Sequence, residues 1–194
     1  MKQRLYIFLL CAVLTMTAAC THCSDTKHDE KADAAQQRYD EAYHAKDMNR
    51  ALAIIDSMET ANIISTPRAD YLRGRVYDQG WQMKIAEHFY KKSYEGYAPT
   101  PSQDWFTYTD AGYRWAVLRY RRGDTEGAMN VTAGLLNQAK ENEAFPREIE
   151  SALLMLMADI QLQLHQFNEA QLTGQKAYEA IQQNNNDENR RISS

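Results

Sequence analysis

The chain has 194 residues, of which 44% are hydrophobic and 25% are charged, and it contains only 8 glycines and 4 prolines. This length and composition are those of a globular protein with a real core, and the scarcity of glycine and proline disfavours a turn-rich β-sandwich. The formal net charge is −4. The chain therefore has no broad basic face for a phosphate backbone, and we expect no binding to nucleic acid.

Residues 1–19 have the layout of a secretory signal peptide. Lys2 and Arg4 form a short basic start, and an uncharged, mostly apolar stretch from Leu5 to Ala19 follows. A membrane-spanning helix needs about 20 residues, so this stretch is too short to form one. It also lacks the polar face that an amphipathic core helix carries. The segment therefore predicts that the protein is exported.

The end of this segment, Thr17-Ala18-Ala19-Cys20, resembles the lipobox of bacterial lipoproteins. The resemblance implies that Cys20 is acylated and becomes the mature N-terminus, so that the lipid tethers the protein to a membrane without spanning it. Thr17 stands where the motif usually has leucine, and a cut by ordinary signal peptidase after Ala19 is the alternative. Residues 20–31 are polar and aperiodic, which predicts a flexible tether.

Cys20 and Cys23 also form a C-T-H-C motif, a spacing that suits redox or metal chemistry. A redox motif needs a strand before it and a helix after it, and covalent haem attachment needs histidine directly after the second cysteine, where Ser24 stands. A zinc site needs ligands that a fold holds in place. We therefore expect neither a metal site nor a cofactor.

The rest of the chain predicts helices separated by short turns. Thr66-Pro67 is typical of a helix start, Ser102 suits an N-cap, and Pro146 opens the final pair of helices. No segment between residues 30 and 183 has the alternation and turn chemistry of a β-hairpin. The polar tail, residues 184–194, is expected to be frayed. The predicted helices cover residues 32–45, 48–62, 67–79, 82–96, 103–121, 125–142, 147–164 and 167–183.

A repeat of 42 residues organises these helices. Three pairs of small residues recur, each pair is separated by twelve residues, and each pair lies 42 residues after the one before. Two antiparallel helices joined by a short turn approach closely only where the residues in contact are small. The pattern therefore predicts three successive helical hairpins with repeat-packing residues at Gly74 and Ala86, Ala116 and Ala128, and Ala158 and Ala170.

The repeat resembles the tetratricopeptide family. In residues 67–98, Gly74, Tyr77, Ala86 and Tyr90 fall on four signature positions of that family. The family step is about 34 residues, so a step of 42 implies longer helices. The resemblance implies an all-α solenoid of about four hairpins over residues 32–183, with a degenerate first hairpin.

In this family the first helix of each hairpin lines a concave groove that binds a partner. The resemblance places eight residues in that groove: Tyr71, Arg75, Asp78, Tyr113, Arg114, Val117, Tyr120 and Arg121. Arginine beside aromatic residues favours capture of a peptide carboxylate or an acidic segment. The alternative is that these arginines pair with neighbouring acids while the aromatic rings pack between hairpins.

The apolar run 153–157, which contains Met155 and Met157, predicts buried core, although methionine also suits adaptable binding surfaces.

The sequence contains no Ser-His-Asp spacing, phosphate loop or HExxH motif, and we expect no enzyme. Our prediction is a lipid-anchored, non-catalytic scaffold that faces the periplasm or the cell surface and binds a peptide or partner protein. One alternative is a sensor or input domain, because repeats of this sort behind an export signal resemble the sensor halves of Bacteroidetes histidine kinases. Another is an accessory lipoprotein in outer-membrane assembly or nutrient uptake.

Overall fold

The computed structural model describes residues 30–97 and 104–192, with the backbone alone given for residues 187–192. The expected signal peptide and the predicted lipidation site, Cys20, lie outside the described residues. The chain divides between Ile64 and Ser65 into two compact units, where the sequence predicted one repeat domain over residues 32–183. Each unit is described by itself.

The first unit is one helical hairpin. Residues 30–44 form its first helix, and α2, Met48–Thr60, forms its second. Tyr39 is fully buried in the first helix, at the position where the repeat would place a small residue. Asp47 caps α2, since its carboxylate accepts a hydrogen bond of 3.1 Å from the Arg50 amide. The predicted helices at 32–45 and 48–62 are thus present within a few residues.

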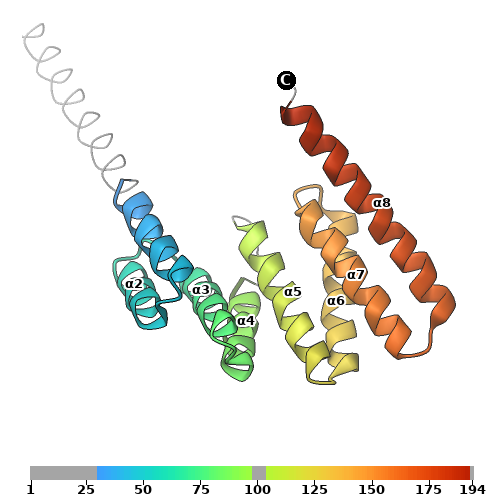
Figure 1. The fold of residues 1–194 in the computed structure, drawn as a ribbon, viewed down its shortest axis with the longest axis horizontal. Coiled ribbons are helices and arrows are strands. Elements are labelled where there is room, and N and C mark those ends of the chain that lie inside the picture. Colours follow the sequence, from blue (N-terminus) through green and yellow to red (C-terminus); the bar gives the residue numbers. More distant parts are fainter. Residues whose placement is uncertain (1–29, 98–103, 193–194) are drawn as a thin grey trace, which may run out of the picture. The chain divides into compact units, whose positions relative to one another are not determined.

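The second unit contains the six helices that follow (Figure 1). No strand occurs in residues 30–97 or 104–192, so the predicted all-α class is confirmed. Most of these helices begin and end within two residues of their predicted limits. They are α3 Thr66–Gln79, α4 Met83–Tyr97, α5 Trp105–Arg121, α6 Thr125–Glu141, α7 Arg147–Gln163 and α8 Phe167–Ile192.

The C-terminal helix corrects one prediction. We expected α8 to end at residue 183 and the polar residues after it to fray, but the backbone is helical as far as Ile192. Polarity alone does not end a helix. After Gly174 the chain contains neither glycine nor proline, so no residue interrupts the hydrogen-bonded turns.

The turn inside each hairpin contains a residue with a left-handed backbone conformation. In the second unit, Trp81, Gly123 and His165 have φ angles of 60°, 89° and 60°, and they follow one another at steps of 42 residues. At each of these turns the left-handed residue donates to the carbonyl three residues before it, and the next residue donates to the carbonyl five before it. These paired bonds form the Schellman motif that ends a helix. The structure therefore repeats its turns with the step of the sequence pattern.

The predicted repeat-packing residues are buried with one exception. Ala86, Ala116 and Ala128 are completely buried, and Ala170 is 4% exposed. Ala158 is only partly buried. Its neighbours on α7, Leu156 and Ile160, are buried in a core cluster with Ala116 and Ala128.

Gly74 is needed for a reason that the sequence did not show. A β-carbon built on Gly74 would lie 2.7 Å from two ring atoms of Tyr90, a distance that real β-carbons essentially never reach. Tyr90 is itself completely buried. The absent side chain of Gly74 therefore makes room for the Tyr90 ring, one turn beyond Ala86 on α4.

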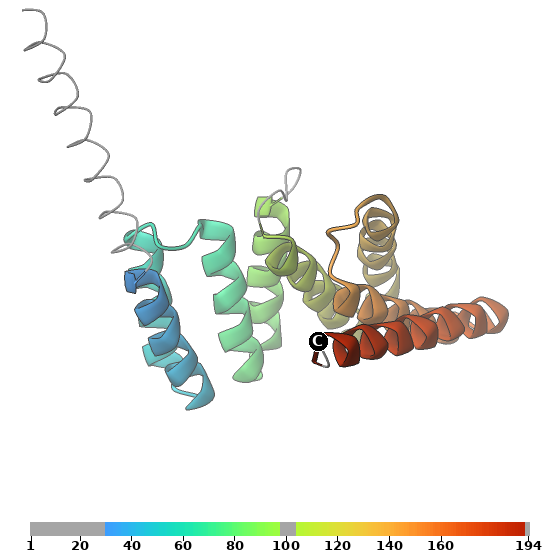
Figure 2. The same cartoon turned by 90° about the horizontal axis from the view of Figure 1, so that it is seen from above.

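The first helices of the three hairpins are neighbours. Besides the contacts within each hairpin, α3 contacts α5, and α5 contacts α7. Within the last hairpin, α7 and α8 lie side by side, as both views show (Figures 1 and 2). The predicted groove residues lie on α3 and α5, two helices that contact each other.

Candidate functional site

The structure brings the eight predicted groove residues onto two neighbouring helices. Three of them lie on α3 and five on α5. They differ in exposure: Tyr71 is 2% exposed, Arg121 is exposed, and the other six are partly buried. The eight residues therefore do not form a uniform open groove, and their contacts divide them into a polar network and an apolar strip.

The polar network is centred on a carboxylate that the sequence analysis did not single out. Asp110 is 4% exposed, and its Oδ2 atom accepts hydrogen bonds of 2.6 Å from the Tyr71 hydroxyl and 2.6 Å from Nε of Arg114. Arg114 also lies 3.8 Å from Oδ2 of Asp78, which accepts a hydrogen bond from the Tyr90 hydroxyl at 3.4 Å. The network thus joins α3, α4 and α5 through groups that satisfy one another.

The pKa directions in this network follow from burial and charge. Burial raises the pKa of the Tyr71 hydroxyl, and the adjacent Asp110 carboxylate raises it further. Burial also raises the pKa of Tyr90. For Arg114, burial lowers the pKa, but the charge and hydrogen bond of Asp110, together with Tyr90 and Tyr71, outweigh this effect and the net shift is upward. Both tyrosines are therefore neutral and Arg114 is charged at neutral pH.

Two further arginines, Arg119 near the end of α5 and Arg122 directly after it, also have partners within the chain. Nη2 of Arg119 lies 2.7 Å from Asp124, and its guanidinium sits over the Trp115 ring, 5.1 Å from the centroid. Arg122 lies 3.0 Å from Glu87. Arg121 is the only one of the four arginines between residues 114 and 122 that makes no ion pair within the described part of the chain. The alternative in which the arginines pair with neighbouring acids describes Arg114, Arg119 and Arg122.

An apolar strip runs beside this network on α5 and α7. Tyr113, Val117 and Tyr120 are half-buried against the cluster that contains Ala116 and Ile160. The Tyr120 hydroxyl donates to the main-chain carbonyl of Asp159 at 3.4 Å, which joins the two helices. The α5–α7 surface is defined here as these three residues together with two exposed apolar residues of α7, Met155 and Leu162.

Met155 and Leu162 complete this surface, and of the two only Met155 was named from the sequence, as core with a binding surface as the alternative. Their side chains are 53% and 50% exposed, and their spacing of seven residues places them on one face of α7, two turns apart. The prediction of a buried core is therefore wrong for Met155. The signal was present in the repeat, because Met155 and Leu162 lie 42 residues after the predicted groove residues Tyr113 and Tyr120.

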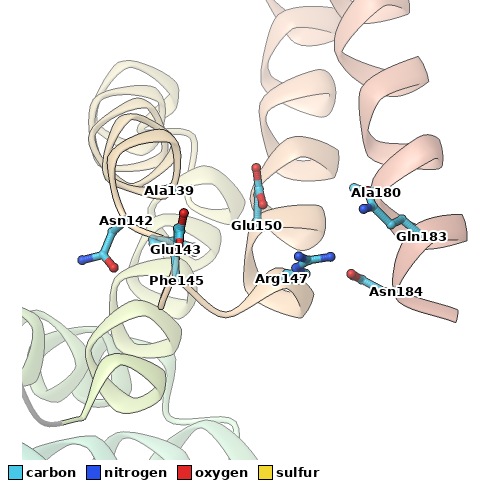
Figure 3. Close-up of a pocket in the computed structure, with 9 residues that line it drawn as sticks. All are labelled: Ala139, Asn142, Glu143, Phe145, Arg147, Glu150, Ala180, Gln183 and Asn184. Atoms are coloured by element: carbon cyan, nitrogen blue, oxygen red, sulfur yellow. The ribbon is translucent and has the colours of Figure 1, made fainter. Parts of the chain in front are cut away.

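A separate pocket opens between the last three helices (Figure 3). Its volume is about 620 Å³, within the range of small-molecule sites. The lining is mostly polar, with a buried aromatic ring in its floor. The pocket is lined by Ala139, Asn142, Glu143, Phe145, Arg147, Glu150, Ala180, Gln183 and Asn184.

The described residues show neither a metal-binding cluster nor a membrane-spanning helix. No group of three or more histidine, cysteine, aspartate or glutamate side chains is placed to hold a metal ion. No helix in residues 30–97 or 104–192 has the length and apolar character needed to cross a membrane.

The described part of the chain is thus all-α, with paired helices, a partly buried polar network, an apolar strip and a polar pocket. Comparisons with known protein families, with curated proteins and with solved structures found no match for this chain.

Proposed function

We propose that this chain is a non-catalytic, tetratricopeptide-like scaffold that binds an apolar segment of a partner protein on the α5–α7 surface. The observation that carries the proposal is the pair Met155 and Leu162, which stay about half exposed on α7, a helix that contacts α5. Exposed apolar side chains that cluster on one face mark interaction surfaces, and methionine adapts its shape to different partners.

The chemistry of the partner follows from the ion pairs that the arginines already make within the chain. Because Arg114 already pairs with Asp110 and Asp78, the surface has little unpaired positive charge to offer an acidic peptide. Exposed Arg121 supplies one cation at the rim. An amphipathic helix that presents apolar residues at every third or fourth position is the segment that fits such a strip.

A panning experiment with a random peptide library displayed on phage tests this proposal. The immobilised full chain should enrich peptides with apolar residues at helical spacing. Met155→Glu combined with Leu162→Glu should weaken binding of the enriched peptides at least about tenfold, because each charge removes a buried apolar contact. Leu172→Glu is the matched control, since Leu172 is 66% exposed on α8. Failure to enrich such peptides, or equal binding by the double variant, would overturn the proposal.

The same proposal places the protein outside the cytoplasm, held to a membrane by a lipid on Cys20. It is supported by the basic start, the apolar stretch and the Thr17-Ala18-Ala19-Cys20 motif. Metabolic labelling with a palmitate analogue should tag the wild-type protein and leave Cys20→Ala untagged. Equal labelling of the two proteins would refute the anchor.

A sensor or input domain is the second candidate function. The polar pocket between α6, α7 and α8 favours it, because a scaffold that only binds proteins has no need of such a cavity.

A further inference from the structure

The pocket is built from three segments that are far apart in the sequence. The end of α6 and the loop after it contribute Asn142, Glu143 and Phe145. The first turns of α7 contribute Arg147 and Glu150, and the second half of α8 closes the other side. A molecule bound here would touch both helices of the last hairpin and the loop that precedes it.

Its charged groups are separated within the pocket. Figure 3 shows the carboxylates of Glu143 and Glu150 on one side of the opening, whereas the guanidinium of Arg147 points towards Asn184 on the other. Glu143 is exposed and Glu150 is half-buried, and neither makes an ion pair or a side-chain hydrogen bond within the described residues. Arg147 and Glu150 are three residues apart on α7, so their side chains start about 5–6 Å from each other.

We propose that this pocket binds a zwitterion, namely a short peptide with free ends or a free amino acid. The ammonium group would lie between the two glutamates, and the carboxylate would accept hydrogen bonds from Arg147 and the Asn184 amide. A guanidinium has several N–H donors, so Arg147 can bind a carboxylate while it keeps another partner. The buried ring of Phe145 provides an apolar floor for the ligand backbone.

The lining residues disfavour simpler ligands. A phosphate or a dicarboxylate would place negative charge beside Glu143 and Glu150, whereas a simple amine would place its positive charge in the same pocket as the Arg147 guanidinium. The volume of about 620 Å³ exceeds the need of one small amino acid, which favours a peptide of a few residues.

Calorimetric titration of the full chain with defined probes tests the proposal. Trialanine should bind, whereas N-acetyl-trialanine, which lacks the ammonium, and trialanine amide, which lacks the carboxylate, should each bind at least about tenfold more weakly. Alanine is the arm that separates a free amino acid from a peptide. The proposal is overturned if neither trialanine nor alanine binds in the millimolar range, or if the capped peptides bind as well as trialanine.

A matched pair of variants assigns the binding to the pocket. Glu150→Gln should weaken trialanine binding at least about tenfold, because the ammonium loses a charged acceptor. Glu126→Gln removes the same charge from an exposed glutamate in the first turn of α6, outside the pocket, and should bind as the wild type does. Circular dichroism should show the same helix content in both variants. Unchanged binding by Glu150→Gln refutes the site.

This inference does not depend on the α5–α7 surface. The variant with Met155→Glu and Leu162→Glu should bind trialanine as tightly as the wild type, because neither residue lines the pocket. Failure of peptide panning would therefore leave the zwitterion site standing, and failure of the titration would leave the proposed scaffold function standing.

Discussion

The hydroxyl of Tyr71 donates a hydrogen bond of 2.6 Å to the buried carboxylate of Asp110, and this bond ties α3 to α5. The same oxygen atom of Asp110 also accepts a hydrogen bond from Arg114, one turn further along α5. One carboxylate therefore binds a residue of the preceding hairpin, Tyr71, and a residue of its own helix. A buried charge is tolerated when such partners surround it, and it becomes costly when one is removed.

Tyr71→Phe tests this bond, because it removes the hydroxyl and keeps the ring. We expect the free energy of unfolding to fall by about 2 kcal/mol, the usual value of a hydrogen bond to a charged acceptor. Urea denaturation followed by circular dichroism measures the change. Tyr120→Phe is the control, since the Tyr120 hydroxyl makes an exposed bond of 3.4 Å and its loss should cost less than about 0.5 kcal/mol. Equal effects of the two substitutions would contradict the prediction.

Gly74→Ala tests the packing of the first hairpin of the second unit. The added methyl group would lie 2.7 Å from the ring of Tyr90, which is enclosed on all sides, and we expect a loss of about 1–3 kcal/mol. Gly134→Ala in α6 is the comparison, because nothing lies within 4 Å of the position of its β-carbon. That substitution should stabilise the helix by about 0.5–1 kcal/mol. Thermal denaturation of both variants should therefore show shifts of opposite sign.

Trp81 occupies a backbone conformation that suits glycine. Its φ angle is 60° and its side chain is 82% exposed, so the left-handed conformation brings no compensating burial. We expect Trp81→Gly to raise the free energy of unfolding by about 1 kcal/mol. Gly123→Ala, at a φ of 89°, should lower it by a similar amount. A destabilised Trp81→Gly variant in urea denaturation would show that the indole makes stabilising contacts.

Asp124 links stability to pH. The hydrogen bond from Arg119, and then the bond from the Gly127 amide, hold the pKa of this carboxyl below its ordinary value. Because the pKa is lower in the folded state, the stabilisation is complete above the unfolded pKa of about 4. It is lost as the pH falls through the folded pKa.

Asp124→Asn is the variant that isolates this effect, since asparagine still caps α6. It should be less stable than the wild type at pH 7, and the difference should shrink as the pH falls below about 4. Urea denaturation of both proteins at neutral and acid pH gives the two differences. A difference that does not change with pH would mean that the charge of Asp124 contributes nothing to stability.

Most of the fold was predictable because local signals and the repeat agree. The predicted helix at 103–121 is found as Trp105–Arg121, and its N-cap is Asp104 instead of Ser102. Likewise, the predicted helix start at Thr66-Pro67 is present, but Ser65 caps α3 and Thr66 is the first residue inside the helix. Several adjacent residues in these loops have side chains able to cap a helix, and only the backbone conformation decides which of them does so.

The candidate site was less predictable, because it depends on which flank of each helix is covered. Asp110 and Arg114 are four residues apart, so their pairing was open to sequence reasoning. The contact of Arg114 with Asp78 on α3 was not, since it requires two hairpins to pack in a particular register. Met155 belongs to an apolar run, and only the packing of α7 shows that this member of the run faces outwards.

The recurrence of one turn at Trp81, Gly123 and His165 has a consequence for how such a chain can lengthen or shorten. Since the backbone leaves each turn in the same conformation, inserting or deleting a 42-residue module between two of these joints keeps every later helix in phase with its neighbours. An insertion of one or two residues inside a helix would instead rotate the residues after it away from the face that they occupy. Duplication of whole modules is therefore the route by which this architecture can vary in size without redesign of its interior.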